Sequence, residues 1–331
     1  ARVARGPPHG PLRTTRTEPP RARRDGAARM TGHTPTTDAI SVAIPAHNEA
    51  AVIERTLGAL LASIEAAGIT RAEVRVVANA CSDDTATIAR RALDHLPAAV
   101  DIDFCVTETS TPGKTNALNL ADDALTLFPR WYLDADITIS TNAVREVHAA
   151  LERTGVCAAA PRMTFDLSLS SAPVRAYYRT WQRMPYFDHG PIAGAYALTR
   201  DARARWDRWP HVISDDGFAR LHFQPSERVS VRSASMTVLA PRTWEALLGI
   251  KSRSRAGGIE LRERFPELFV NEDCAPRRSA SRMFLTPAEW PDAAVYALVN
   301  LIASRRARAK LAREAQGQAR SWERDETSRD R

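Results

Sequence analysis

The sequence lacks the short motifs that mark the commonest nucleotide and hydrolytic sites. No G-x-G-x-x-G follows an apolar run and no G-x-x-x-x-G-K-[ST] occurs, so a standard nicotinamide site or P-loop is not expected. G-x-S-x-G and H-E-x-x-H are also missing, so neither an α/β-hydrolase nor a zinc protease of the H-E-x-x-H type is expected. The four cysteines form no C-x-x-C pair, so they predict neither a zinc site nor a disulfide framework and favour a reducing, cytoplasmic location.

Long apolar runs are missing as well. No stretch reaches the roughly 18 apolar residues that a membrane-spanning helix needs, and the N-terminus has no apolar core of a secretory signal. The formal charge is +7, but residues 1–29 carry +6 and residues 303–331 carry +4, which leaves the segment between them at −3. We therefore predict a disordered basic tail over residues 1–37 and no nucleic-acid partner for the mildly acidic body.

From about residue 40, short β-branched runs alternate with helical patterns. The runs "ISVAIPAH", "EVRVVANA", "VDIDFCVTE" and "RWYLDADI" are typical of strands, and "NEAAVIERTLGALLASIEAAG", "DDTATIARRALDHL" and "GKTNALNLADDALTLF" are typical of helices. Asn48 is placed to cap the first helix and Gly68 to end it. This alternation predicts βαβ units, a parallel sheet and an α/β fold.

Polar clusters follow three of the predicted strands. His47, Asn48 and Glu49 follow the first strand, residues 79–84 follow the second, and Asp134 with Asp136 ends the fourth. Parallel sheets bind ligands beyond the carboxyl ends of their strands, so a metal and phosphate site is one interpretation. In the other interpretation, each group has a structural role: a helix cap, first-turn acids, and two solvated carboxylates on one strand face.

Five segments, in this order, resemble glycosyltransferase family 2: "SVAIPAHNEAAVIERTL", "VVANACSDDTATIA", "GKTNALN", "LDADI" and "ISDDGFARLHF". The resemblance implies a GT-A (nucleotide-diphospho-sugar transferase) fold, with a mostly parallel central sheet flanked by helices and a smaller acceptor-side subdomain. It places the GT-A domain at 38–286, with a nucleotide-binding half at 38–140 and an acceptor half at 141–286. Residues 287–331 are then a C-terminal amphipathic helix and basic tail.

The resemblance also implies a donor site with Mg²⁺ or Mn²⁺. Asp136 would ligate the metal on the diphosphate, and Asp134 would contact the ribose or the metal's water shell. Lys114 is one of only three lysines and follows a turn glycine at a helix start, where it could contact phosphate. The resemblance implies eleven further substrate-binding residues, of which two arginines are expected on a mobile loop. They are Pro45, Ala46, His47, Asn48, Glu49, Asn79, Asp83, Gly113 and Gly194, together with the arginine pair Arg253 and Arg255.

In "ISDDGFARLHF" the resemblance makes Asp216 the catalytic base and gives Asp215 an orienting role. The structural alternative is an acidic first helical turn capped by Ser214. The Q-x-x-R-W motif of processive members is missing, which favours transfer of one sugar per encounter. Asn79 stands where the family has an acid, so the base of the donor stays open between uracil and guanine.

The segment "PDAAVYALVNLIASRRARAK" places Val295, Leu298, Val299 and Ile302 on one helical face before a basic run. Docking of this face on the protein's own domain is favoured over contact with the cytoplasmic face of a membrane. Tyr177, Tyr178 and Trp181 are expected in the core, although they could stack on acceptor sugars.

The resulting hypothesis is an inverting, non-processive glycosyltransferase. It would move a sugar from a nucleotide-sugar donor, preferentially a UDP-sugar, to a glycan, glycolipid or small-molecule hydroxyl in polysaccharide or glycolipid biosynthesis. A non-catalytic sugar-nucleotide- or glycan-binding module is the alternative. A sugar-phosphate nucleotidyltransferase is less well supported, because "IPAHNE" stands where that class has a Gly-rich loop and an arginine.

Overall fold

The described part of the chain contains one mixed sheet. The computed structural model describes residues 38–187, 192–272 and 287–316, so the predicted tail at 1–37, the end of the chain from 317 and Cys274 lie outside it. The eight strands run in the order β3-β2-β1-β4-β7-β6-β8-β5. Their bounds are β1 Ala39–Ala46, β2 Arg71–Asn79, β3 Asp101–Thr109, β4 Arg130–Leu133, β5 Thr138–Ile139, β6 Ala158–Asp166, β7 Ala195–Leu198 and β8 Arg228–Leu239.

The predicted parallel strands are confirmed as β3, β2, β1 and β4, which pair in parallel. Ala46 at the end of β1 lies opposite Ala78, and Asn79 at the end of β2 lies opposite Thr109. The carboxyl ends of these strands are therefore level, and the polar segments after them share one edge of the sheet. β7 and β5 join the sheet antiparallel to their neighbours.

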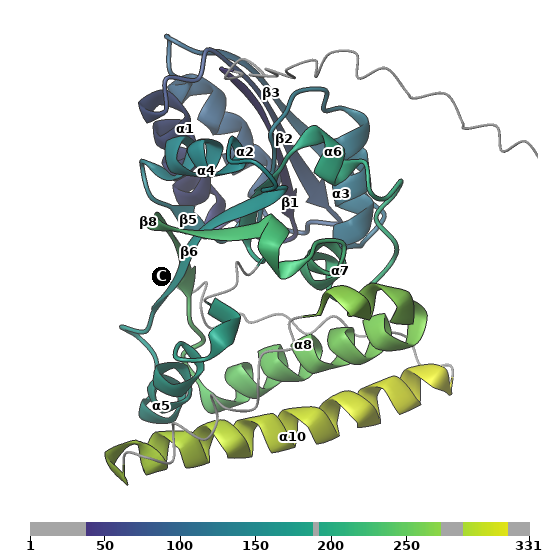
Figure 1. The fold of residues 1–331 in the computed structure, drawn as a ribbon. Helices are drawn as coiled ribbons and strands as arrows, with labels where there is room; N and C mark the ends of the chain where they lie inside the picture. The colour runs from purple at the N-terminus through teal and green to yellow at the C-terminus, as the bar shows by residue number, and fades with distance from the viewer. Residues whose placement is uncertain (1–37, 188–191, 273–286, 317–331) are drawn as a thin grey trace, which may run out of the picture. The chain divides into compact units, whose positions relative to one another are not determined.

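Helices cover both faces of the parallel strands, with α1, α2 and α4 on one side and α3 on the other (Figure 1). For α1, α2 and α3 this split follows from right-handed crossovers, because the strand order reverses direction after β3. The helices are α1 Ile53–Ala66, α2 Thr85–Arg91, α3 Lys114–Asp123, α4 Ala143–Leu151, α5 Ala172–Trp181, α6 Arg200–Arg203, α7 Asp215–Leu221, α8 Trp244–Arg264 and α10 Trp290–Ala315. Short 3₁₀ turns span Ala92–His95, Pro185–Phe187, Pro225–Glu227, Pro266–Asn271 and Pro287–Glu289.

The first helix ends as predicted but begins later. Its last residue is Ala66, and Gly68 then takes a positive φ of 69°, which an L side chain rarely adopts. The prediction that Asn48 caps α1 is wrong, because the helix starts only at Ile53. Asn48 itself has a φ of 54°, and its Oδ1 accepts a hydrogen bond from the backbone N–H of Ser82 at 2.7 Å.

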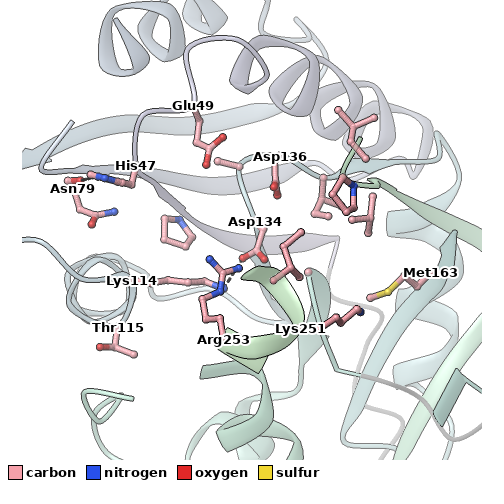
Figure 2. Close-up of a pocket in the computed structure, with 18 of the residues that line it drawn as sticks. His47, Glu49, Asn79, Lys114, Thr115, Asp134, Asp136, Met163, Lys251 and Arg253 are labelled. Carbon is pink, nitrogen blue, oxygen red and sulfur yellow. Dashed lines mark hydrogen bonds and ion pairs between the residues drawn. The ribbon is translucent and has the colours of Figure 1, made fainter. Parts of the chain in front are cut away.

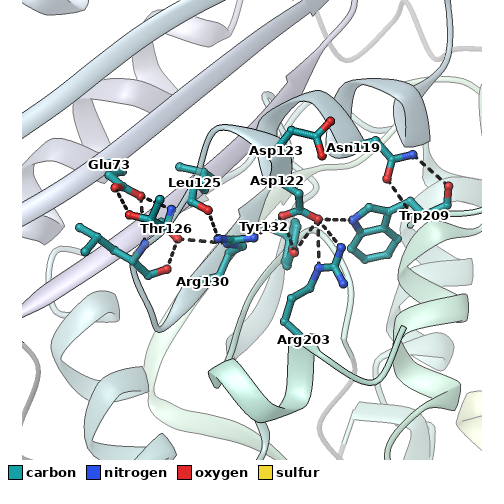
Figure 3. A network of polar contacts seen from close by, with 12 residues as sticks. Glu73, Asn119, Asp122, Asp123, Leu125, Thr126, Arg130, Tyr132, Arg203 and Trp209 are labelled. Atoms are coloured by element: carbon teal, nitrogen blue, oxygen red, sulfur yellow. Dashed lines mark hydrogen bonds and ion pairs between the residues drawn. The ribbon is translucent and has the colours of Figure 1, made fainter. Parts of the chain in front are cut away.

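A buried polar network around Asp122 fixes β4, the strand that leads to the Asp-x-Asp segment (Figure 3). The Asp122 carboxylate pairs with Arg130 at 2.9 Å and with Arg203 at 2.8 Å. It also accepts hydrogen bonds from the Tyr132 hydroxyl and the Trp209 indole, each at 2.8 Å. The four donors come from β4, α6 and the loop before α7, so the network joins these segments to the end of α3.

The helices α8 and α10 lie side by side below the sheet, and α5 packs against both (Figure 1). Val299 of α10 is fully buried, as the docking interpretation expects, whereas Leu298 is 48% exposed. The apolar face of α10 is therefore only partly covered. None of the helices in the three described ranges is both long and apolar enough to cross a membrane.

Candidate functional site

A cavity of about 490 Å³ lies at the carboxyl edge of the parallel strands. Figure 2 shows Lys114, Asp134 and Arg253 close together within it, with His47 and Asn79 on one side. The predicted site residues that line it are Pro45, His47, Glu49, Asn79, Gly113, Lys114, Asp134, Asp136, Gly194 and Arg253. The sequence motifs that lie far apart in the chain are thus brought together around one space.

The two acidic motifs meet at one lysine. Lys114, the first residue of α3, places its Nζ 2.7 Å from Asp134 Oδ1 and 2.9 Å from Asp215 Oδ2. Gly113 precedes it with a φ of 134°, so the helix starts with a turn that suits glycine. A single ammonium group therefore holds together two carboxylates that are 81 positions apart in the sequence.

Burial controls the protonation of this cluster. The pKa of Asp134 is raised because burial disfavours its charged form, and the nearby Asp215 and Asp136 raise it further against the opposing effect of Lys114. Burial and Asp216 likewise raise the pKa of Asp215. For Lys114 burial acts in the opposite direction, but the surrounding carboxylates outweigh it and raise its pKa, so the lysine stays charged.

The acids of the Asp-x-Asp segment lie beyond the strand. The expectation that Asp134 and Asp136 project from one strand face is wrong, because β4 ends at Leu133 and both acids lie in the turn before β5. The backbone N–H of Asp134 donates to the carbonyl of Gly194 at 2.7 Å. Gly194 has a φ of 71°, and a Cβ there would lie 3.3 Å from Ile137, so this contact depends on glycine.

The carboxylates fit a divalent cation that is shared with a ligand. Within the described residues, no group of three or more His, Cys, Asp or Glu could hold a metal by itself. Asp134 and Asp136 both line the cavity and supply hard oxygen ligands. Mg²⁺ and related ions are commonly held by one or two carboxylates together with substrate phosphates. These two acids suit that arrangement better than a closed, all-protein site.

The predicted nucleoside loops are fixed by their own hydrogen bonds. Asn79 is only 4% exposed, and its amide donates to Ala46 O at 2.8 Å and accepts from Gly113 N at 3.1 Å. His47 Nδ1 lies 2.7 Å from the carbonyl oxygen of Asn79. Asp83 accepts from Ala50 N at 3.1 Å and does not line the cavity. Asn79 and Asp83 therefore position the loops that surround the cavity.

Asp216 faces a second cavity of about 590 Å³. Its Oδ1 accepts hydrogen bonds from the Ser214 hydroxyl at 2.7 Å and from the Gly217 N–H at 2.6 Å. Ser214 caps α7 as the sequence suggested, since its side chain also accepts from Gly217 N. On α8, Gly257 allows close approach to this turn, because a Cβ there would lie 2.8 Å from the Ser214 Cβ. Of the two adjacent acids, therefore, Asp216 lines the second cavity, whereas Asp215 lines neither cavity and is paired with Lys114.

The arginine pair is divided between the two cavities. Arg253 lines the first cavity, whereas Arg255 lines the second and donates to Asn300 Oδ1 at 2.6 Å. The expectation that both lie on a mobile loop is wrong, because they belong to the 21-residue helix α8. The long helix forms because α5 and α10 pack against it, and this packing involves residues distant in the sequence.

Lys251 is a functional candidate that the sequence analysis missed. It is 8% exposed, lines both cavities, and places its Nζ 3.2 Å from the centre of the Trp181 ring and within 5.4 Å of the Tyr177 and Tyr178 ring centres. Burial and the nearby Arg255 lower its pKa to about 7. The scarcity of lysine in the chain was the one signal that could have drawn attention to it. The three aromatic residues, expected in the core, both pack there and border the cavities.

Comparison with known proteins gives a family and a fold. The model of the family described as "Glycosyl transferase family 2" matches residues 41–205. No curated protein sequence matches the chain. Among solved structures, the chain is similar to the mannosyltransferase PcManGT from Pyrobaculum calidifontis in complex with GDP-Man and Mn²⁺, at 20% identity and a TM-score of 0.50, covering 85% of this chain and 76% of that one.

Two further solved structures are less similar. The first is S. aureus TarS 1-349 in complex with UDP, with 14% identity, a TM-score of 0.46, and coverage of 87% of this chain and 95% of that one. The second is glucosyl-3-phosphoglycerate synthase from Mycobacterium tuberculosis with Mn²⁺, UDP and glucosyl-3-phosphoglycerate. It has 19% identity and a TM-score of 0.44, and the match covers 68% of this chain and 79% of that one.

Proposed function

The chain belongs to glycosyl transferase family 2 and has a GT-A fold, and from this membership we propose that it is an inverting, non-processive nucleotide-sugar glycosyltransferase. One observation carries the proposal. The Asp-x-Asp segment and the acidic turn of α7 meet through the ion pairs of Lys114, at 2.7 Å and 2.9 Å. In this proposal the ion pairs hold the donor site next to the turn that carries Asp216, the proposed proton acceptor.

In this proposal the first cavity binds the nucleotide sugar, with a UDP-sugar as the preferred donor. Asp134 and Asp136 would hold Mg²⁺ or Mn²⁺ on the diphosphate, and the cation would stabilise the negative charge that develops on the leaving group. Lys114 and Arg253 supply positive charge from the protein itself. The structures of PcManGT with GDP-Man and Mn²⁺ and of other nucleotide-bound relatives support this assignment.

The second cavity places Asp216 beside the incoming acceptor. Only its Oδ1 takes part in the hydrogen bonds described above, so Oδ2 can accept the proton of an acceptor hydroxyl. That oxygen bonds to the anomeric carbon while the bond to the diphosphate breaks, and the bonding electrons leave with the diphosphate. The proton goes to Asp216, and the configuration at the anomeric carbon inverts. General-base assistance of this kind contributes about 10²- to 10⁴-fold in rate.

The acceptor is a hydroxyl of a glycan, a glycolipid or a small molecule. We propose a cytoplasmic location, since Cys81, Cys105 and Cys157 are free thiols that suit a reducing compartment. A glycolipid acceptor would bring the protein to a membrane surface through the exposed Trp290 and Leu298 of α10. Co-sedimentation with anionic vesicles tests that contact, and failure to co-sediment removes it.

The experiment uses water as the acceptor, so that it does not depend on knowing the natural one. The wild-type protein is incubated with Mn²⁺ and a panel of UDP-, GDP- and dTDP-sugars, and release of the nucleoside diphosphate and the anomer of the free sugar are followed. We expect Asp216→Asn to slow release by about 10²-fold or more while nucleotide binding is unchanged. The exposed Asp123→Asn is the matched control.

Wild-type release by the Asp216→Asn variant would exclude Asp216 as the base. Retention of the anomeric configuration would contradict the inverting mechanism. Metal-dependent binding without any release by the wild-type protein would instead support the non-catalytic binding module.

A further inference from the structure

We propose that the acceptor carries an apolar group, an alkyl chain or an aromatic ring, which binds in an apolar end of the first cavity. This inference rests on the proposed function, because it assigns the rest of that cavity to the nucleotide sugar. It deepens that function by naming the chemical class of the acceptor. The acceptor is then a hydroxyl compound with an apolar part rather than a fully hydroxylated glycan.

The first cavity has a polar end and an apolar end. His47, Asn79 and Asp134 line the polar end, where the predicted nucleoside loops meet the Asp-x-Asp segment. Figure 2 shows Met163 and Lys251 on the far side of Asp134 from His47 and Asn79. The apolar end is formed by five half-buried residues that line the cavity, namely Met163, Phe165, Val238, Leu239 and Ile250.

Strand pairing groups three of these side chains on one face of the sheet. Phe165 of β6 lies opposite Val238 of β8. Met163 comes two residues before Phe165 in the same strand, so both side chains point to the same face. The Phe165 ring also packs against the Tyr178 and Trp181 rings of α5, with ring centres 4.8 Å and 5.1 Å apart. The sheet and α5 therefore form one continuous apolar wall.

This wall lies between two separate hydrophobic clusters of the described residues. Met163 and Val238 pack against the main core, which includes the central strands. Phe165 and Trp181 pack against a smaller cluster formed mainly by α5, α8 and α10. Protein interiors are close-packed, and apolar cavities bind apolar molecules because each new contact adds dispersion energy. An apolar ligand at this place would join the two clusters.

The apolar end suits an alkyl or aromatic group better than a sugar ring. The side chains of Phe165, Val238, Leu239 and Ile250 have no hydrogen-bond donor or acceptor, and the Met163 thioether is only a weak acceptor. A hydroxyl group buried against them would lose its hydrogen bonds to water without gaining others. A buried CH₂ group has no such loss and gains about three- to fourfold in affinity.

The place of the apolar end favours the acceptor over the donor. Trp181 and Lys251 line both cavities, and the second cavity contains Asp216, the proposed base. An acceptor with its apolar part in the first cavity would therefore reach toward Asp216 past these two side chains. His47 and Asn79, which surround the proposed nucleoside position, lie on the other side of Asp134 (Figure 2). The nucleotide and the apolar group would thus bind together.

The test uses four probes that share one sugar and differ in the apolar group: methyl, butyl, hexyl and phenyl β-glucoside. Their affinities for the full chain are measured by calorimetry, alone and with Mn²⁺ and saturating UDP or GDP, whose own binding is titrated on the same sample. We expect hexyl glucoside, phenyl glucoside or both to bind about tenfold or more tightly than methyl glucoside, with or without the nucleotide. The hexyl and phenyl probes distinguish an alkyl chain from an aromatic ring.

The variant Met163→Gln/Val238→Thr makes the apolar end polar with little change in side-chain size. We expect it to reduce the preference for the apolar glucosides to about threefold or less. The matched control Leu169→Gln/Val270→Thr changes two residues that are 53% and 84% exposed and line neither cavity, so it should leave the preference unchanged.

If the first variant fails to fold, the heat-capacity change of binding to the wild-type protein provides a second measurement. Burial of the apolar group should make this change more negative for hexyl or phenyl glucoside than for methyl glucoside. Equal heat-capacity changes would contradict the inference.

Equal affinities of the glucosides, binding of none, or a preference that survives in Met163→Gln/Val238→Thr would overturn the inference. Competition between the apolar glucosides and the nucleotide would also overturn it, because the apolar end would then belong to the donor. Failure of UDP and GDP to bind is a separate outcome. It would remove the proposed donor function, whereas the preference and its loss in the variant would still show whether the apolar end binds such a group.

Discussion

Replacing Lys114 with Met removes the positive charge that joins the two acidic motifs while keeping a side chain of similar length. The lysine lies 2.7 Å from Asp134 and 2.9 Å from Asp215, whose side chains are 34% and 8% exposed. Removing one partner of a buried ion pair costs about 3–5 kcal/mol. Because the Lys114 side chain is itself 25% exposed, we expect the lower end of this range, about 3 kcal/mol at pH 8.

The loss of stability in the Lys114→Met variant should become smaller as the pH falls. The pKa values of Asp134 and Asp215 are already raised in the folded protein, and removal of the ammonium raises them further. The folded variant then binds more protons than the unfolded chain at mildly acidic pH, so its stability increases as the pH falls from 8 to 5. The difference between the variant and the wild-type protein should therefore be smaller at pH 5.

Urea unfolding at pH 8 and pH 5 measures this difference. The double variant Lys114→Met/Asp215→Asn removes one of the uncompensated carboxylates and should recover about 1 kcal/mol or more at pH 8. Lys310→Met, which removes a lysine charge from α10, is the control for the loss of a charge as such. An equal loss at both pH values, or no recovery in the double variant, would refute the electrostatic reasoning.

Two further predictions concern stability away from the cavity. Asp122→Asn should lower the free energy of unfolding by about 3 kcal/mol, because Arg130 and Arg203 lose the carboxylate they share. Asp123→Asn breaks only an exposed ion pair and should lower it by less than about 1 kcal/mol. Similar losses for the two variants in denaturant unfolding would contradict this. His148 has its pKa lowered to about 4, chiefly by burial, so the unfolded chain binds a proton that the folded protein excludes between pH 6.5 and 4. Between pH 6.5 and 4 the wild-type protein should therefore lose up to about 3 kcal/mol of stability that the His148→Leu variant keeps, and an unchanged pH profile in the variant would contradict the prediction.

Local patterns predicted the parallel half of the sheet and the edge of the sheet at which the first cavity lies. The β-branched runs marked β1, β2 and β4, and the polar residues after each strand marked the edge where the cavity lies. The periodicity of "NEAAVIERTL" did not reveal the late start of α1. The loop before it is held by a long-range hydrogen bond that the Ser82 N–H donates to Asn48 Oδ1, and the sequence pattern carries no information about that contact.

The second cavity was harder to predict because its wall depends on packing between distant helices. The segment with Lys251, Arg253 and Arg255 has the charge density of a surface loop, yet α5 and α10 pack against it as a helix. Helical spacing then turns Arg253 and Arg255 toward different cavities. Only the packed structure shows that Lys251 lies between them.

The measurement that most directly tests the central claim is calorimetric titration of the chain with UDP-, GDP- and dTDP-sugars, first with Mn²⁺ and then with excess chelator. Asp136→Asn serves as the site variant, and Asp123→Asn, which removes an exposed carboxylate, serves as the control. We expect that the nucleotide sugars of one base bind, that chelation abolishes binding, and that of the two variants only Asp136→Asn weakens it. Binding that survives both chelation and Asp136→Asn, or no binding of any donor, would contradict it.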